Sequence, residues 1–266
     1  MMKKNQFLKE EPDADEFIKP FISAHEYLYG EKRWVIWLVD ADPKKFKNLP
    51  KVMERVKAVE SFRKASKAAS TKNYPYHTLF RQVTQPKGDY ILIPGHTSEN
   101  RQYIPFGFFS KEDIVGNSSF ALPDATLFHF GVLSSAMHMA WVRYTCGRLK
   151  SDFRYSKDIV YNNFPWPDNP SDKDKQAIEV AAQAVLDARA KFPDSSLADL
   201  YDPLTMPPVL LKAHQQLDKA VDAAYGKKNF RTEAERVAFL FELYQKYTSS
   251  LPVKNERKPT PGNTLS

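Results

Sequence analysis

The spacing of apolar residues changes along this 266-residue chain. In the first half, short apolar runs rich in β-branched and aromatic residues are separated by Pro- and Gly-containing breaks, which is typical of strands joined by turns. The runs that best fit strands are residues 33–39, 90–93, 103–109 and 119–122. Because the first of these is apolar almost throughout, we expect it to be a buried strand.

Two longer segments before residue 168 have helical spacing instead. In residues 50–69 the apolar positions recur every three or four residues and leave the basic side chains on the outer faces, which predicts an amphipathic basic helix. Residues 126–146 are mostly apolar and are followed by Gly147, which predicts a single helix that ends there.

After Pro170 the pattern is helical. Residues 171–191, 210–225 and 232–249 have apolar residues at helical spacing, and the last of them begins with the capping box Thr232-Glu233-Ala234-Glu235. The predicted fold is therefore α+β, with a mixed sheet-and-helix domain over residues 20–168 and a small C-terminal helical domain over residues 169–251. Residues 1–19 and 252–266 are polar and are expected to be flexible.

The composition is that of an ordinary globular protein, with 42% hydrophobic and 27% charged residues. No apolar run approaches the roughly 20 residues that span a bilayer, and the N-terminus lacks the apolar core of a signal peptide. Cys146 is the only cysteine, so no disulfide can form within the chain. These features predict a cytoplasmic protein with no membrane partner.

The net charge of +7 is concentrated in one segment. Residues 44–81 contain 11 Lys or Arg and only the acids Glu54 and Glu60, which leaves a segment charge of +9. A focused basic segment on a near-neutral body is typical of a protein that binds a polyanion. The alternative interpretation is a solvated, lysine-rich helix face with no partner.

Motifs for chemistry are absent from the sequence. No Gly-x-Gly turn follows a strand and there is no Walker A lysine, so no nucleotide or S-adenosylmethionine pocket of the usual kind is encoded. The six histidines have no metal-ligand spacing. No Pro-Asp pair is followed by an acid-x-Lys in a strand context, which excludes a recognisable nuclease site. We expect no catalytic residue and no cofactor in this chain.

The most informative segment is residues 141–167. It places long cations and one acid among aromatic residues, an arrangement suited to holding phosphates and reading base edges. The charged residues are Arg143, Arg148, Lys150, Asp152, Arg154 and Lys157.

Residues 147–156 (GRLKSDFRYS) and 161–167 (YNNFPWP) resemble the C-terminal region of MmeI-like enzymes. These are single-chain type II restriction–modification enzymes and related adenine-specific DNA methyltransferases. Four further segments agree in the same order, so that the resemblance extends over residues 19–250. They are residues 19–22, 33–38, 98–105 and 217–226.

The resemblance implies that the chain is a target-recognition domain followed by a C-terminal helical region. In that family the methyl-transfer centre, with its S-adenosylmethionine site, lies N-terminal to this region, as does any nuclease. The chain would thus be the site-selecting fragment of an adenine DNA methyltransferase. Its partners would be duplex DNA and an upstream methyltransferase domain of the same polypeptide.

The resemblance also indicates which residues read bases. Positions matching Lys150 and Asp152 vary as a pair with the base recognised, and those matching Asn117, Ser118 and Arg154 behave similarly. Lysine can donate to guanine O6 and N7, and aspartate can accept from cytosine N4. In an extended segment, residues two apart share a face, which would direct Lys150 and Asp152 into the same groove. The alternative is a local surface ion pair.

Other residues are expected to contact the DNA without reading its sequence. The candidates for phosphate contacts are Arg148, Lys64, Lys67 and Lys72. Tyr155 and Tyr161 are candidates for DNA contacts, whereas Phe164 and Trp166 are expected to pack in the core. A second hypothesis is a non-catalytic RNA-binding or interaction module that uses the basic 44–81 helix as its main contact.

Overall fold

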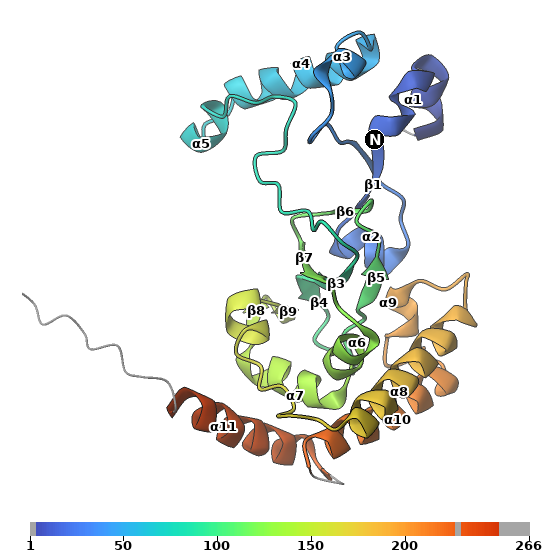
Figure 1. The fold of residues 1–266 in the computed structure, drawn as a ribbon, viewed down its shortest axis with the longest axis vertical. Coiled ribbons are helices and arrows are strands. Elements are labelled where there is room, and N and C mark those ends of the chain that lie inside the picture. Colours follow the sequence, from blue (N-terminus) through green and yellow to red (C-terminus); the bar gives the residue numbers. More distant parts are fainter. Residues whose placement is uncertain (1–3, 227–229, 250–266) are drawn as a thin grey trace, which may run out of the picture.

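The computed structural model describes residues 4–226 and 230–249. An N-terminal helical lobe lies at one end of the molecule, small sheets lie in the middle, and long C-terminal helices lie at the other end (Figure 1). The predicted α+β class is confirmed.

The N-terminal lobe begins with helix α1 (Lys4–Glu10) and a 3-10 helix, η1 (Pro12–Phe17). Phe7, Ala14 and Phe17 are buried in a small core that they share with Phe46 and Val52. The described residues 4–19, expected to be flexible, form helices and the start of a strand, and the Phe17 ring lies 6.1 Å from the ring of Phe46, 29 positions later in the sequence.

Strand β1 (Ile18–Ile22) joins this lobe to the centre of the molecule. It pairs antiparallel with β2 (Trp34–Ile36) and parallel with β6 (Ile114–Val115), and helix α2 (Ala24–Tyr29) lies between β1 and β2 in sequence. The strand expected over residues 33–39 is only three residues long and half-buried. It is short because the chain turns soon after it, with Asp40 at φ 59°.

Helices α3 (Pro43–Phe46), α4 (Pro50–Lys64) and α5 (Ala69–Lys72) form an arm that projects from the lobe (Figure 1). The helix expected over residues 50–69 ends at Lys64. Its apolar face does not pack as expected, because Val52 is its only buried residue and Phe62 is 75% exposed.

The central sheet is built on β3 (Tyr90–Pro94), which is buried throughout. It pairs antiparallel with β5 (Gly107–Phe109) on one side and with β7 (Ser119–Pro123) on the other. The predicted strands at 90–93 and 119–122 are confirmed. Of the strand expected over 103–109, only residues 107–109 pair, although Tyr103, Ile104 and Phe106 are buried in irregular backbone.

A third sheet contains the segment that the sequence singles out. Strand β9 (Asp152–Arg154) lies between β4 (His96–Thr97) and β8 (Gly147–Leu149), and both pairings are antiparallel. Because β4 follows β3 after a single residue, Gly95, this small sheet is held directly against the central one.

The single helix expected over residues 126–146 is two helices, α6 (Leu127–Leu133) and α7 (Ala136–Thr145). Ser135 causes the break, because its hydroxyl donates to the carbonyl of Val132 at 2.7 Å and accepts from the N–H of His138 at 3.4 Å. A serine that bonds neighbouring backbone groups in this way ends one helix and caps the next.

The C-terminal helices are α8 (Asp172–Ala190), α9 (Leu197–Leu200), α10 (Pro208–Ala224) and α11 (Glu233–Ser249). The three long ones confirm the helices predicted at 171–191, 210–225 and 232–249. At the start of α11, Thr232 Oγ1 accepts from the N–H of Glu235 at 3.2 Å. The expected flexible segment 252–266 lies outside the described residues.

One large core includes residues from both sides of residue 168. It extends from Ile91 on β3 to Leu240 on α11 and includes α6, α7, α8 and α10. Helix α6 approaches α8 so closely that a methyl group on Gly131 would lie 2.5 Å from Cγ2 of Ile178. The C-terminal helices are thus an integral support of the sheets above them.

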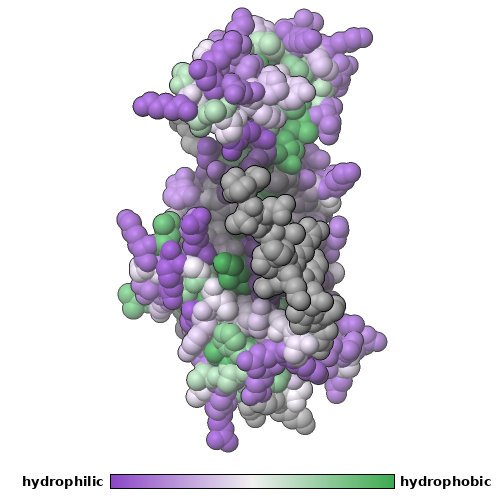
Figure 2. Space-filling model, turned by 90° about the vertical axis from the view of Figure 1, so that its left-hand side faces the viewer, coloured by the Kyte–Doolittle hydropathy of each residue, from purple (hydrophilic) through white to green (hydrophobic). Residues whose placement is uncertain are grey.

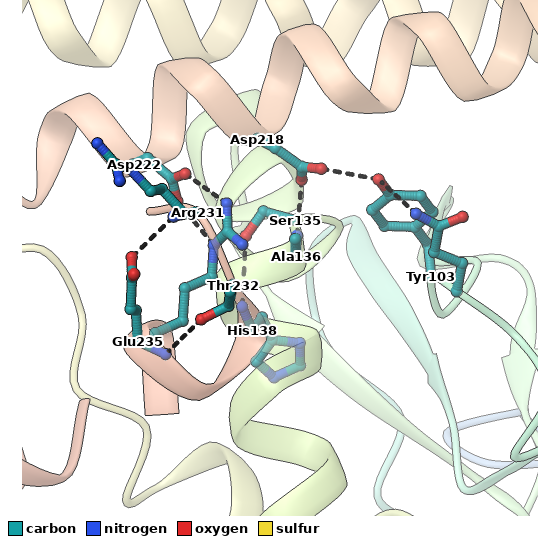
Figure 3. A network of polar contacts seen from close by, with 11 residues as sticks. Tyr103, Ser135, Ala136, His138, Asp218, Asp222, Arg231, Thr232 and Glu235 are labelled. Atoms are coloured by element: carbon teal, nitrogen blue, oxygen red, sulfur yellow. Dashed lines mark hydrogen bonds and ion pairs between the residues drawn. The ribbon is translucent and has the colours of Figure 1, made fainter. Parts of the chain in front are cut away.

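Buried polar contacts connect the same parts (Figure 3). The carboxylate of Asp218 on α10 accepts from the hydroxyl of Tyr103 and from the N–H of Ala136 at the start of α7, each at 2.7 Å. Asp222, one turn further along α10, pairs with Arg236 of α11 at 2.5 Å. These contacts hold α7, α10 and α11 in a fixed arrangement with the loop that contains Tyr103.

Candidate nucleic-acid interface

Strands β8 and β9 form a tight hairpin whose tip is exposed. Leu149 pairs with Asp152, which leaves Lys150 and Ser151 as the two turn residues, and Lys150 has φ 56°. Lys150, Asp152 and Arg154 are all exposed. The hairpin therefore presents three charged side chains, two basic and one acidic, on a short rigid element.

The arrangement differs from the expectation that Lys150 and Asp152 share one face of an extended segment. Lys150 lies in the turn, whereas Asp152 and Arg154 are two apart on β9 and share its exposed face. Phe153 and Tyr155 alternate with them and are buried. Within the described residues no ion pair joins Lys150 to Asp152, so the alternative of a local ion pair is not observed. The weak contact of Asp152 is with the N–H of Glu99, at 3.4 Å.

Arg148 stabilises this hairpin from within. Its guanidinium lies 4.0 Å from the centre of the Phe153 ring and donates to the carbonyl of Ser151 at 2.8 Å. It also lies 3.4 Å from a carboxylate oxygen of Glu99. The side chain expected to hold a DNA phosphate is therefore already engaged in fixing the turn, although it remains partly exposed.

The second predicted reading segment is the loop before β7. Asn117 is exposed, whereas the Ser118 hydroxyl accepts from the N–H of Ala24 at 3.2 Å. Ser118 therefore ties the loop to α2, and Asn117 is the side chain free to face a ligand.

Gly95 connects this loop to the hairpin strand. Its N–H donates to the carbonyl of Ser118 at 2.9 Å, and its own carbonyl accepts from the N–H of Tyr155 at 3.0 Å. A methyl group on Gly95 would lie 2.5 Å from the Ser118 oxygen, so only glycine fits here without a shift of the backbone. One residue thus fixes the spacing between the two segments that the sequence predicts to read bases.

A cleft of about 1170 Å³ opens beside this connection, and Asn117 lines it. Arg81, and Lys157 and Asn162 on the turn after β9, also line it, although the sequence did not mark them as base-reading or phosphate-binding residues. Tyr161, a candidate for DNA contact, also lines the cleft. The exposed polar residues that follow the hairpin strand were the available signal for Lys157 and Asn162.

Tyr155, a candidate for DNA contact, is almost entirely buried, although it forms part of the cleft wall. Only 3% of it is exposed, and its hydroxyl lies 3.0 Å from Nε2 of His138. Burial lowers the pKa of His138 to about 3 and raises the pKa of Tyr155, so both groups are neutral core residues. Phe164 and Trp166 pack in the same core, as expected.

The α4–α5 arm carries most of the basic segment. Figure 2 shows the left-hand side of Figure 1, toward which α5 and α11 project. Hydrophilic residues gather there over the upper lobe. Lys64 pairs with Glu60 at 2.6 Å, and Arg63 donates to two backbone carbonyls. In the described part of the chain, Lys67 and Lys72 are exposed and their side chains have no hydrogen bond or ion pair.

Two surveys of the described residues bear on other classes of site. None of the helices in residues 4–226 and 230–249 combines the length and the apolar character needed to cross a membrane. The same residues contain no group of three or more His, Cys, Asp or Glu side chains arranged to hold a metal ion.

Comparison with known proteins identifies both halves of the chain. Residues 1–168 match the family model of the MmeI target recognition domain, and residues 170–252 match that of the MmeI C-terminal domain. The chain is 37% identical over 238 residues to DNA methyltransferase A of Bacillus subtilis (strain 168). The aligned region covers 89% of this chain and 27% of that protein.

The chain is also similar to a solved structure of the type IIL restriction–modification enzyme MmeI in complex with DNA. The match covers 92% of this chain and 33% of the MmeI chain, with 47% sequence identity and a TM-score of 0.88. The chain thus spans about a quarter of one relative and a third of the other. The resemblance seen in the sequence is confirmed. This chain belongs to the MmeI family and contains the target recognition domain of that family followed by its C-terminal domain.

Proposed function

We propose that this chain selects the DNA site on which a larger methyltransferase or restriction–modification enzyme acts. The observation that carries the proposal is the joint fixing of two exposed reading segments, the β8–β9 hairpin and the Asn117 loop, by the backbone of Gly95. Rigid placement of side chains on two neighbouring segments is what recognition of successive base pairs requires. The DNA complex of the similar enzyme supports the same conclusion.

Each reading residue has a role that follows from its position. Lys150 at the hairpin tip donates to guanine, and Asp152 on the exposed face of β9 accepts from cytosine N4, so the two read one G·C pair. Arg154 shares the face of Asp152 and reads or orients an adjacent position. Asn117 reads a base from the cleft side, and Ser118 holds Asn117 in place through its bond to α2.

Phosphate contacts surround this reading surface. Lys67 and Lys72 are unpaired within the described part of the chain, and Lys64 is held by Glu60, so the first two are the stronger candidates. Arg148 supports the hairpin and offers its remaining exposed edge to a phosphate. These contacts supply affinity and not sequence preference.

The chemistry is assigned to the rest of the polypeptide. The relatives are named for DNA methylation and restriction–modification, and this chain covers only 27% of one and 33% of the other. We therefore propose an upstream methyltransferase domain that uses S-adenosylmethionine to methylate an adenine amino group, in the cytoplasm, where bacterial DNA lies. The role of this chain is then to select the site.

The second candidate is a non-catalytic RNA-binding or interaction module based on the basic 44–81 segment. The exposed lysines of the α4–α5 arm favour it, because they would bind any polyanion. Under this second candidate, RNA would compete for binding at least as well as duplex DNA, and the β8–β9 hairpin would have no part in recognition.

A competition experiment separates the two candidates. A labelled duplex DNA of random sequence is bound by the chain, and unlabelled duplex DNA or RNA is added at two salt concentrations. The proposal predicts that duplex DNA displaces the probe better than RNA, and that binding weakens steeply with salt. Equal or better displacement by RNA would support the second candidate.

A further inference from the structure

The turn after β9 is a π-helical turn, η2 (Lys157–Tyr161), and it forms part of the cleft described above. The N–H of Asn162 donates to the carbonyl of Lys157 at 2.8 Å, and the N–H of Tyr161 approaches the carbonyl of Ser156 at 3.3 Å. Both bonds span five residues. Such turns are rare and are frequently found at functional sites.

This geometry places Lys157 and Asn162 on the same side. In an α-helix, residues five apart differ by about 140° around the axis, because each residue turns the chain by about 100°. In a turn closed from residue i to residue i+5, the two residues lie nearly one above the other. Lys157 and Asn162 therefore both line the cleft that contains Asn117.

The turn is held rigidly from behind. Val160 is fully buried, and its carbonyl accepts from the indole N–H of Trp141 at 3.0 Å. Asn163 donates to the carbonyls of Asp158 and Ile159 at 2.7 and 3.1 Å. The neighbouring Asn162 has only a long contact of 3.4 Å with Asp158, which leaves its amide available.

The cleft has further polar groups that suit a polar ligand. Arg81 lines it as well, with one guanidinium nitrogen 2.8 Å from the Ser70 hydroxyl. The hydroxyl of Ser119 also lines the cleft and is buried without a hydrogen-bond partner within the described residues. Two cations and four side-chain amides line the cleft beside aromatic and aliphatic side chains. The cations and amides can bond the phosphates and base edges of a nucleic-acid strand.

We propose that Lys157 and Asn162 form a further reading position of this chain: the Asn162 amide recognises the major-groove edge of an adenine, and Lys157 holds a phosphate of the same DNA strand. This inference rests on the proposed function. An asparagine amide matches adenine N6 and N7 with two hydrogen bonds, whereas a lysine beside it contributes charge without sequence preference. The reading position lies on the cleft side, apart from the hairpin tip.

The test is a selection of duplexes from a random library by the chain and by single variants, with a salt titration of each. Asn162→Ala is expected to lose preference at one adenine position of the selected motif by about tenfold, without change at the position read by the hairpin. Lys157→Ala is expected to weaken binding to all sequences and to reduce the slope of log affinity against log salt by about 1.

Two exposed residues on α8 serve as matched controls. Gln183→Ala and Lys173→Ala remove an amide and a cation from a helix outside the cleft, and each is expected to leave both the motif and the salt slope unchanged. If the Asn162→Ala variant selects the same motif as the unmodified chain, with equal preference at every position, the inference is wrong while the proposed function stands. If the unmodified chain selects no motif, the proposed function fails, and the inference fails with it.

Discussion

The N–H of Gly95 lies 2.9 Å from the carbonyl oxygen of Ser118, and this contact sets the position of the Asn117 loop against the hairpin strand. The carbonyl of Gly95 completes the connection through Tyr155. Asn117 and Lys150 are 33 positions apart in sequence, yet the two reading segments depend on one backbone unit.

Replacement of Gly95 by alanine is therefore expected to disturb both segments at once. The added methyl group would lie 2.5 Å from the Ser118 oxygen, so the backbone must shift, at a cost of about 1–3 kcal/mol in the free energy of unfolding. Chemical denaturation measures the loss of stability, and selection from a random duplex library measures the effect on reading.

Gly147→Ala is the matched control for this change. Gly147 begins the hairpin, and the nearest atom to an added methyl group is the Arg154 carbonyl oxygen at 3.8 Å, an ordinary contact. Stability and motif should both be close to those of the unmodified chain. Equal effects of the two substitutions would show that the close approach at Gly95 does not matter.

The buried carboxylate of Asp218 should make stability depend on pH. Burial raises its pKa from 3.8 to about 6, so the folded protein binds this proton more tightly than the unfolded chain. The contribution to stability is complete below about pH 4 and is lost as the pH rises through about 6. The free energy of unfolding should fall by about 3 kcal/mol across this window because of Asp218.

Asp218→Asn isolates this effect from other titrating groups. Burial also raises the pKa of Asp222, which changes stability in the same direction, and lowers the pKa of His138, which changes it in the opposite direction. The free energy of unfolding of the variant and of the unmodified chain is therefore measured from pH 4 to pH 7. The difference between the two values should change with pH as expected for the titration of Asp218 alone. Parallel curves would show that Asp218 does not titrate in this range.

The α4–α5 arm should supply affinity without specificity. Lys67→Ala combined with Lys72→Ala removes two exposed cations, so the slope of log affinity against log salt should decrease by about 2 while the selected motif stays the same. Lys173→Ala with Lys191→Ala, at the two ends of α8, removes the same charge elsewhere and should leave the slope unchanged. An altered motif in the arm variant would contradict this division of roles.

Much of the fold was predictable from local pattern. The three long C-terminal helices and strands β3 and β7 were found because each has a clear period and a defined start or end, such as Ser171 before α8. The break at Ser134 and Ser135 was missed because the apolar spacing continues across it. Only the hydroxyl bonds of Ser135 to Val132 and His138 reveal where the first helix ends.

The site was predictable in composition and not in geometry. The alternation of exposed Asp152 and Arg154 with buried Phe153 and Tyr155 was present in the sequence and would have predicted that Tyr155 is mostly buried. The turn at Lys150 was not indicated, because lysine rarely adopts positive φ and no Asn-Gly pair marks the hairpin. The π-turn at Lys157 has no sequence period, so its two cleft residues required the structure.

The most direct test of the central claim is an exchange of charge on the hairpin. The chain with Lys150→Glu and Asp152→Arg is used to select duplexes from a random library in parallel with the unmodified chain. If these residues read one G·C pair, the selected motif changes at that base pair, and the other positions and the overall affinity stay similar. Selection of the same motif by both proteins would contradict the assignment of sequence reading to this hairpin.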